Sequence, residues 1–289
     1  MRTSAALEVE DSDALIAIDF LVDNVNLSKS RLKKLMNAGG VWLRRGDAPR
    51  YRLRRAMTDL KPGDVLEVFY DQALLEQPLR PSECLQDCEI YSVWAKPAGV
   101  FCAGSDWGDH NTLLRQAELH FNKQRPVWRV NTVPAAGRGL VLISHHKRAS
   151  AGLADLWRSG HLQTHWRLTV QGDQGPRLQQ ADGRLSPAAA EAAQVAGVPS
   201  LELVSLAART AAHSTRVEVS GSGLTSVQLL EWAQQLELSL PCAGESTTAA
   251  ELLTRAEDEP EDPVESAPLE LTGMDFDCPF TGESRHYRL

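Results

Sequence analysis

Several side chains in this sequence are of types that do chemistry, and their spacing decides which chemistry each could perform. His161 and His165 have the i, i+4 spacing at which a helix presents two imidazoles to zinc. Leu162 stands where a zinc hydrolase has its glutamate, and the segment runs into a strand pattern, so we expect no metal there. Cys84 and Cys88 have no second pair at zinc-ribbon spacing, so we expect reduced, mostly buried thiols.

Nucleophilic and phosphate-binding motifs are also incomplete. Ser144 and Ser150 lie near the adjacent His145 and His146, but neither serine stands in the Gly-x-Ser-x-Gly turn that exposes a nucleophile. We expect ordinary surface hydroxyls. The glycines on either side of Arg138 are not followed by Lys-Ser or Lys-Thr, so they predict a turn before a strand and not a phosphate-binding loop.

Charge predicts a different kind of site. Between residues 29 and 55 ten basic side chains stand against a single acid, Asp47. The ten are Lys29, Arg31, Lys33, Lys34, Arg44, Arg45, Arg50, Arg52, Arg54 and Arg55. A solvated helix face is the usual fate of such charges. With almost no acid nearby to pair with them, however, we expect these residues to bind the phosphate backbone of a nucleic acid. The net charge of -8 does not argue against this, because a whole-chain sum hides how charge is distributed.

These cations need elements that hold them on one face. Residues 12–38 show two short helical patterns, and the second begins at a predicted N-cap, Ser28, and ends at Gly39 and Gly40. Strand patterns follow at residues 41–44, 51–55 and 65–70. The sequence therefore predicts a small αα-β domain over residues 1–75, with the lysines of the second helix facing solvent.

From about residue 79 the pattern changes to a larger mixed α/β domain, so that the whole chain is of the α+β class. Strands are predicted at residues 91–94, 140–143, 167–170, 201–206 and 215–219, helices near 112–121 and 226–236, and a last strand segment at 269–287. We expect this domain to span residues 76–289. It contains a Gly-, Pro-, Ala- and Gln-rich segment, 173–200, which predicts an irregular insertion, and an acidic linker, 245–268, too polar to order itself.

Composition favours a cytoplasmic protein that does not enter a membrane. The chain has 289 residues, of which 43% are hydrophobic, which suits a globular core. No apolar run approaches the roughly twenty residues that span a bilayer. The first residues are acidic where a signal peptide would be basic.

Several short motifs occur in an order that is characteristic of one known family. The second helix opens with Leu-Ser-Lys-Ser-Arg, and Leu-Lys-Pro-Gly-Asp-Val-Leu-Glu-Val follows. Residues 93–100 read Val-Trp-Ala-Lys-Pro-Ala-Gly-Val, residues 166–172 read Trp-Arg-Leu-Thr-Val-Gln-Gly, and residues 276–283 read Phe-Asp-Cys-Pro-Phe-Thr-Gly-Glu. In order and spacing they resemble the RluA-type pseudouridine synthases, preceded by a small RNA-binding domain first described in a ribosomal protein. The resemblance extends over nearly the whole chain.

The resemblance implies a fold of pseudouridine synthase type and an enzyme that isomerises uridine in RNA without a metal or organic cofactor. Family members attack a flipped-out uridine with the aspartate of a His-Arg-Leu-Asp motif. Alignment without a gap from Gly139 backward places Asn131 at the histidine, Thr132 at the arginine and Pro134 at the aspartate. A second alignment keeps Arg129 and places Asn131 at the nucleophile. Neither alternative supplies a carboxylate, so no catalytic residue is intact.

Three further family features are changed. Trp166 stands at the tyrosine that packs against the target base, and Cys278 stands at a histidine. The family's Gly-Arg-Thr-His-Gln-Ile-Arg corresponds best to residues 223–229, which lack its basic side chains. The alternative aligns residues 213–216 with His-Gln-Ile-Arg.

These observations predict a non-catalytic RNA-binding relative of the pseudouridine synthases. Its expected partner is structured RNA, either rRNA or tRNA. We expect no association with a membrane. Two alternatives stay open: an active synthase with a rearranged site, and a protein-interaction scaffold whose acidic linker faces a protein partner.

Overall fold

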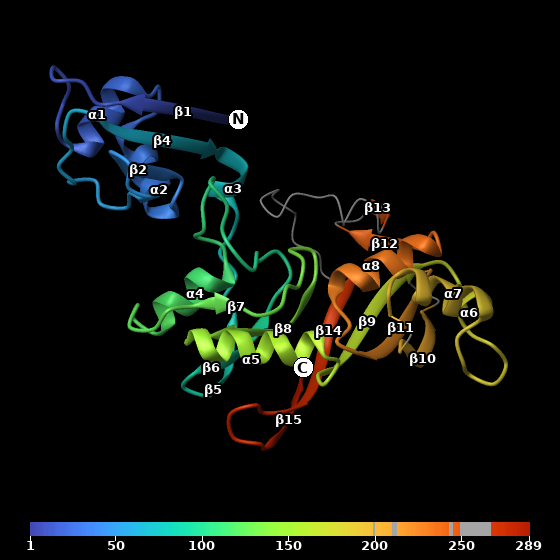
Figure 1. Cartoon of the computed structure of the whole chain (residues 1–289). Helices are drawn as coiled ribbons and strands as arrows, with labels where there is room; N and C mark the ends of the chain where they lie inside the picture. The colour runs from blue at the N-terminus through green and yellow to red at the C-terminus, as the bar shows by residue number, and fades with distance from the viewer. Residues whose placement is uncertain (199, 210–212, 243–244, 249–266) are drawn as a thin grey trace. The chain divides into compact units, whose positions relative to one another are not determined.

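The computed structural model describes residues 1–198, 200–209, 213–242, 245–248 and 267–289. The chain forms two compact units (Figure 1). Unit 1 comprises Met1–Leu79 together with Ala103–Gln116, and unit 2 comprises Arg80–Cys102 and the described residues from Ala117 onward. The division into domains of residues 1–75 and 76–289 stays a prediction, and Ala103–Gln116 is the segment that the structure assigns to the earlier part of the chain.

Unit 1 is a four-stranded antiparallel sheet with its helices packed against it (Figure 1). The strand order is β1-β4-β2-β3. Its elements are β1 (Arg2–Glu8), α1 (Ala17–Asn24), α2 (Lys29–Ala38), β2 (Val41–Arg45), β3 (Tyr51–Arg52), β4 (Asp64–Asp71) and α3 (Gln72–Glu76). The two predicted helices and the strands after them are confirmed, whereas β1 has no counterpart among the expected elements.

Helix α2 shows why this part of the fold could be read from the sequence. The hydroxyl of Ser28 accepts the backbone N–H of Arg31, as an N-cap should. Gly39 ends the helix in the left-handed conformation, at φ 86°, which glycine adopts without a steric penalty. The leucines of the helix are fully buried, and its lysines are exposed.

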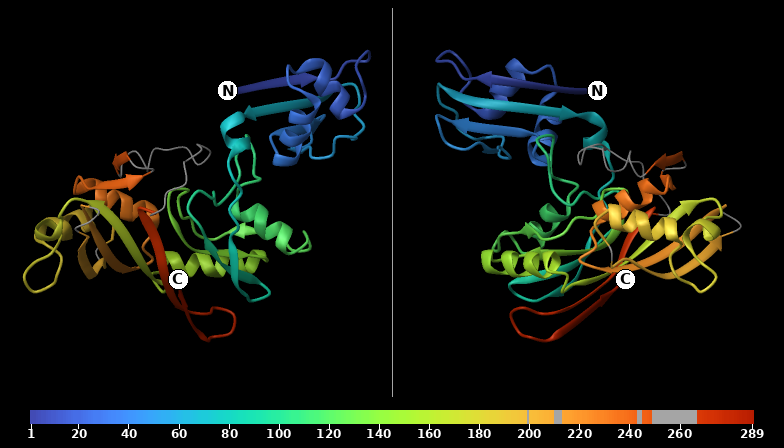
Figure 2. Two further views of the ribbon diagram at one scale, coloured as in Figure 1. Left: turned by 180° about the vertical axis from the view of Figure 1, so that it is seen from behind. Right: turned by 45° about the vertical axis from the view of Figure 1, so that its right-hand side comes forward.

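Unit 2 is built on a nine-stranded mixed sheet of order β10-β11-β9-β14-β8-β6-β5, with β15 paired to β14 and β7 to β8 (Figure 2). Its strands are β5 (Glu83–Asp87), β6 (Tyr91–Lys96), β7 (Trp128–Arg129), β8 (Arg138–Ser144), β9 (Gln163–Gln171), β10 (Glu202–Arg209), β11 (Ser214–Ser222), β14 (Leu269–Asp277) and β15 (Ser284–Arg288). A two-stranded sheet joins β12 (Ser239–Cys242) to β13 (Glu245–Thr248). The helices are α4 (Leu113–His120), which starts in unit 1, α5 (Lys147–Arg158), α6 (Gly175–Leu178), α7 (Pro187–Val195) and α8 (Ser226–Gln235).

The expected mixed α/β character and the return of the chain end to the sheet are both confirmed. Strand β14 runs parallel to β8 and antiparallel to β9, and so occupies the middle of the sheet. One face of β9 carries Trp166 and Leu168 into the core. The other face carries charge, and there Arg167 bonds Glu218 at 3.0 Å and Glu270 at 3.0 Å.

The segment 173–200 was expected to be irregular, but it contains the helices α6 and α7. Ser186 caps α7 by accepting the N–H of Ala189, and Pro187 opens its first turn. The buried face of α7 consists of alanines. Alanine side chains give too weak a hydrophobic period to reveal a helix from the sequence. Within the acidic linker 245–268, residues 249–266 lie outside the described residues.

One further observation concerns membranes. None of the helices in the described ranges has both the length and the apolar character needed to cross a bilayer.

Candidate functional site

The motif positions of unit 2 come from three distant parts of the chain, and the structure brings them together. Residues 131–134 lead toward β8, Trp166 lies in the middle of β9, and Leu224 precedes α8. Ser226 donates its hydroxyl to the carbonyl of Thr132 at 3.1 Å, and the indole N–H of Trp166 donates to the carbonyl of Leu224 at 3.1 Å. These contacts join residues 131–134, Trp166 and residues 224–226, whereas Ser214 and Arg216 lie at the opposite end of β11.

Asn131, which both alignments place in the catalytic motif, forms side-chain hydrogen bonds to the backbone of strand β8. Its side-chain amide donates to the carbonyl of Leu140 at 3.1 Å, and its side-chain oxygen accepts the N–H of Leu142 at 2.8 Å. The residue is buried. Its amide therefore satisfies two backbone groups of β8 and is not presented to a substrate.

The next residues are held through their backbone. The thiol of Cys102 donates to the carbonyl of Val133 at 3.2 Å, and the same sulfur accepts the N–H of Val133 at 3.5 Å. The carbonyl of Pro134 accepts the N–H of Gly137 at 3.0 Å. The thiol of Cys102 thus satisfies both backbone polar groups of Val133, as a neighbouring strand would. Sequence reasoning missed this role of Cys102, because a lone buried thiol gives no spacing signal.

Lys96 is a second residue that sequence reasoning did not single out as functional. Its side chain is 1% exposed, and its ammonium group donates to the carbonyls of Val100 at 2.7 Å and Gly137 at 2.8 Å. The turn between residues 96 and 100 also bonds the motif loop directly, because Gly99 donates to the carbonyl of Ala135 at 2.8 Å. Lys96 therefore ties the family-like Lys-Pro-Ala-Gly turn to the turn that follows Pro134.

The chemistry available at these positions is limited. In the part of the chain that the structure describes, every hydrogen bond of residues 131–134 runs to backbone, to the hydroxyl of Ser226 or to the thiol of Cys102. No Asp or Glu is among these partners. Trp166 is 1% exposed, and its indole N–H donates to the carbonyl of Leu224. The side chain is therefore part of the hydrophobic core and not a stacking platform for a base.

The ten cations of unit 1 fall into two groups. Five of them have carboxylate partners. Lys29 bonds Asp19 at 2.7 Å and Arg45 lies 3.4 Å from Asp64, while Arg50, Arg52 and Arg54 pair with Glu67, Asp106 or Asp109. The expectation that the segment has almost nothing to pair its cations is therefore wrong for these five. The partners all lie outside residues 29–55, where a local count of acids could not find them.

The other five cations, among the residues described, have no carboxylate partner. They are Arg31, Lys33, Lys34, Arg44 and Arg55, and all five are exposed. The first three lie on α2. Arg31 and Lys34, one helical turn apart, line a small surface pocket of about 100 Å³ together with Tyr70, Gln72, Leu75 and Glu76.

Two of the paired arginines, the exposed Arg50 and the partly buried Arg52, also contact an aromatic ring. Arg50 and Arg52 stack over the ring of Trp42 with their guanidinium carbons 4.6 and 4.3 Å from its centroid. Burial lowers the pKa of Arg52, although Asp109 beside it acts in the opposite direction. The hydrogen bond that Arg50 donates to Asp106 is the main cause that raises the pKa of Arg50.

The histidine pair that has zinc spacing does not converge. His161 bonds the hydroxyl of Ser159 at 2.8 Å, whereas His165 bonds the carboxylate of Asp275 at 2.6 Å. Burial opposes ionisation of Asp275, but hydrogen bonds from Arg288, His286 and His165 outweigh it and lower the pKa of that carboxyl well below its usual range. Across the described ranges no group of three or more His, Cys, Asp or Glu side chains could hold a metal.

The serine and histidine pairs also serve the fold. Ser144 is fully buried, so the expectation of a surface hydroxyl is wrong for this residue. His145 lies between the hydroxyl of Ser92 at 2.8 Å and the carbonyl of Pro126 at 2.9 Å. Because a carbonyl only accepts, Nδ1 carries the hydrogen and Nε2 accepts from Ser92. His146 caps helix α5.

Comparison with known proteins gives a structural likeness and no sequence match. No protein-family model matches the chain, and no curated protein matches it. Among solved structures, the chain is similar to human RNA pseudouridylate synthase domain containing 4, with a TM-score of 0.44 and 12% identity over 71% of this chain and 87% of that one. It is similar to human RNA pseudouridylate synthase domain containing 1, with a TM-score of 0.46 and 12% identity over 74% and 85%.

A third likeness covers more of the chain. A crystal structure of a pseudouridylate synthase gives a TM-score of 0.36 and 11% identity over 94% of this chain and 96% of that one.

Proposed function

We propose that this protein is a relative of the pseudouridine synthases that binds structured RNA, rRNA or tRNA, and does not isomerise uridine. The observation that carries the proposal is the convergence of residues 131–134, Trp166 and residues 224–226. These segments carry the family-like motifs and meet as a single site would require, around positions that hold an amide and a proline. Proline has no nucleophile and no proton to exchange, and an amide is a very poor nucleophile.

RNA contact on this proposal runs through unit 1. Arg31, Lys33 and Lys34 on α2 are exposed and have no carboxylate partner among the described residues. A phosphate backbone supplies the negative charge that the fold does not. Arg44 and Arg55 are two further exposed cations of unit 1, outside α2. The five cations that pair with Asp or Glu were predicted to contact RNA as well, and on the present proposal they contribute less.

RNA binding is tested with a filter-binding or gel-shift titration of structured RNA against salt. We expect Lys33→Ala/Lys34→Ala to weaken binding and to reduce the slope of log K against log salt by about 1.4–1.8, since each phosphate contact contributes about 0.7–0.9. The matched control is Lys147→Ala/Arg148→Ala, which removes the same charge from the exposed start of helix α5 in unit 2. Absence of binding by the wild type at low salt would contradict RNA binding.

The absence of catalysis needs a separate test. Pseudouridine is mapped by mass spectrometry in RNA from cells with and without the gene, and the purified protein is then added to RNA from the deletion strain. We expect the same pseudouridine sites in both cell types. A site that disappears on deletion and returns with the purified protein would show an active synthase.

A further inference from the structure

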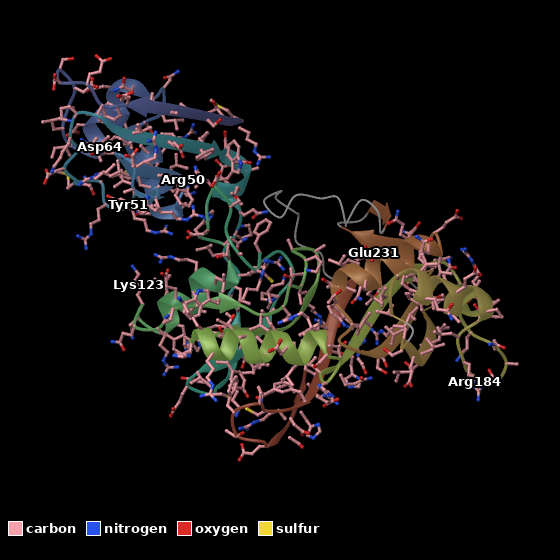
Figure 3. The ribbon with its side chains drawn as sticks, viewed as in Figure 1. Arg50, Tyr51, Asp64, Lys123, Arg184 and Glu231 are labelled. Atoms are coloured by element: carbon pink, nitrogen blue, oxygen red, sulfur yellow. The ribbon has the colours of Figure 1, made fainter. Side chains whose placement is uncertain are left out.

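Residues 103–112, which we call the acidic loop, bring two carboxylates to the arginines of unit 1. The guanidinium of Arg50, labelled in Figure 3, bonds Asp106 at 2.6 Å. Arg54 bonds Asp109 at 2.5 Å, and Arg52 lies 3.3 Å from the same carboxylate oxygen. The acidic loop therefore contacts three of the ten cations that were predicted from the sequence to bind RNA.

The charges on this surface cancel. The ion pairs join three arginines, namely 50, 52 and 54, to three carboxylates, those of Glu67, Asp106 and Asp109, so that +3 and -3 sum to zero. Carboxylate and phosphate oxygens accept the same guanidinium N–H groups in the same planar geometry. The acidic loop thus presents to the arginines what an RNA backbone would present.

The loop is anchored independently of its carboxylates. The indole N–H of Trp42 donates to the carbonyl of Asp106 at 3.0 Å, and the N–H of Asp109 donates to the carbonyl of Ala38 at 2.9 Å. Arg52 also donates to the carbonyl of Ser105 at 2.7 Å. An Asp→Asn change at 106 keeps all of these bonds, so the charge can be removed while the loop stays in place.

One oxygen of Asp109 is poorly satisfied where it lies. Both arginine contacts go to Oδ2, and Oδ1 is buried with no hydrogen-bond partner. A buried charged oxygen without a partner costs free energy. The position of Asp109 is therefore not the one that folding stability alone would favour. Such a position is expected if the carboxylate has a further role beside the arginines.

We propose that the acidic loop is an internal substitute for RNA phosphate, which occupies Arg50, Arg52 and Arg54 and restricts RNA to the exposed cations of α2. This inference rests on the proposed RNA binding by unit 1. It assigns a role in RNA affinity to Asp106 and Asp109, and it makes the loop a built-in competitor of the nucleic acid.

The size of the effect follows from counterion release. Removing the charge of Asp106 gives the surface one net positive charge, enough for one more phosphate contact. One contact steepens the slope of log K against log salt by about 0.7–0.9, which is about a fivefold to eightfold gain in affinity for each tenfold reduction in salt. Removing the charge of Asp109 as well should give a second contact and a larger slope.

The test compares Asp106→Asn and Asp106→Asn/Asp109→Asn with matched controls, using structured RNA over a range of salt. The controls are Asp47→Asn and Asp47→Asn/Asp59→Asn, which remove the same charge from exposed side chains of unit 1 that pair with no cation among the residues described. Circular dichroism and a thermal melt check that each variant is folded. If the double variant is unfolded, Asp106→Asn alone decides.

We expect the acidic-loop variants to bind RNA more tightly and with a steeper salt dependence than both the wild type and the controls. If the wild type binds RNA and Asp106→Asn binds no better than Asp47→Asn, the loop is only structural and the inference is wrong. If neither the wild type nor any variant binds at low salt, the proposed function itself fails.

Discussion

Replacing Asn131 by alanine tests whether the catalytic-motif position has become a structural one. The side chain completes the hydrogen bonds of two buried backbone groups of β8, the carbonyl of Leu140 and the N–H of Leu142. Leaving a buried polar group without a partner costs about 1–3 kcal/mol, so the two groups together predict a loss of about 2–6 kcal/mol. Because a whole domain is stable by only about 5–15 kcal/mol, unit 2 should be severely weakened.

The measurement is the free energy of unfolding in urea, combined with hydrogen exchange of the β8 amides as a local readout. The control is Thr132→Ala, since the neighbouring hydroxyl forms no hydrogen bond within the described ranges; this change should cost less than about 1 kcal/mol. We expect the amide of Leu142 to lose protection only in Asn131→Ala. Equal stability of the two variants, with Leu142 still protected, would refute the structural role and return Asn131 to the list of candidate reactive residues.

Three further outcomes are expected. Burial lowers the pKa of His145 below its ordinary value of 6.5, so below that pH the unfolded chain binds more protons and the stability of unit 2 should fall; His145→Gln should flatten this dependence in urea titrations. Gly39→Ala should destabilise unit 1 by at least about 1 kcal/mol in a thermal melt, because φ is 86° and a Cβ would lie 2.8 Å from Asp109. Trp166→Phe should cost about 1–3 kcal/mol in the same assay, since it removes the indole hydrogen bond to Leu224 and leaves a gap in the core, while the hydroxyl of Thr164 still donates to the same carbonyl.

The elements with a strong local signal could be predicted from the sequence. Helix α2 has a capping serine, buried residues on one face and a terminal glycine, and all three are where the pattern placed them. Strand β1 could not be predicted, because nearly all of its side chains are exposed and no alternation of apolar and polar residues marks it. The strand is held mainly by its backbone ladder to β4, with Arg2 near Asp71 and Leu7 against the core, and a sequence pattern does not show such pairing.

The candidate site divides in the same way. Pro134 and Asn131 could be seen as unsuited to nucleophilic attack from their side-chain chemistry alone. The pairing of Arg50, Arg52 and Arg54 could not be foreseen, because the carboxylates of the acidic loop stand more than fifty residues further along the chain. Charge counting within a short window assumes that counterions are local, and here the fold supplies them from a distance.

The place of Ala103–Gln116 within unit 1 has a consequence for synthesis on the ribosome. A nascent chain that has emerged only as far as Leu79 carries the arginines of β3 and the loop after it but not the acidic loop. Until residue 109 follows, Arg52 and Arg54 lack the Asp109 carboxylate that accepts their N–H groups in the folded unit. During synthesis there is therefore an interval in which Arg52 and Arg54 are available to any polyanion. This interval ends once the acidic loop has been translated.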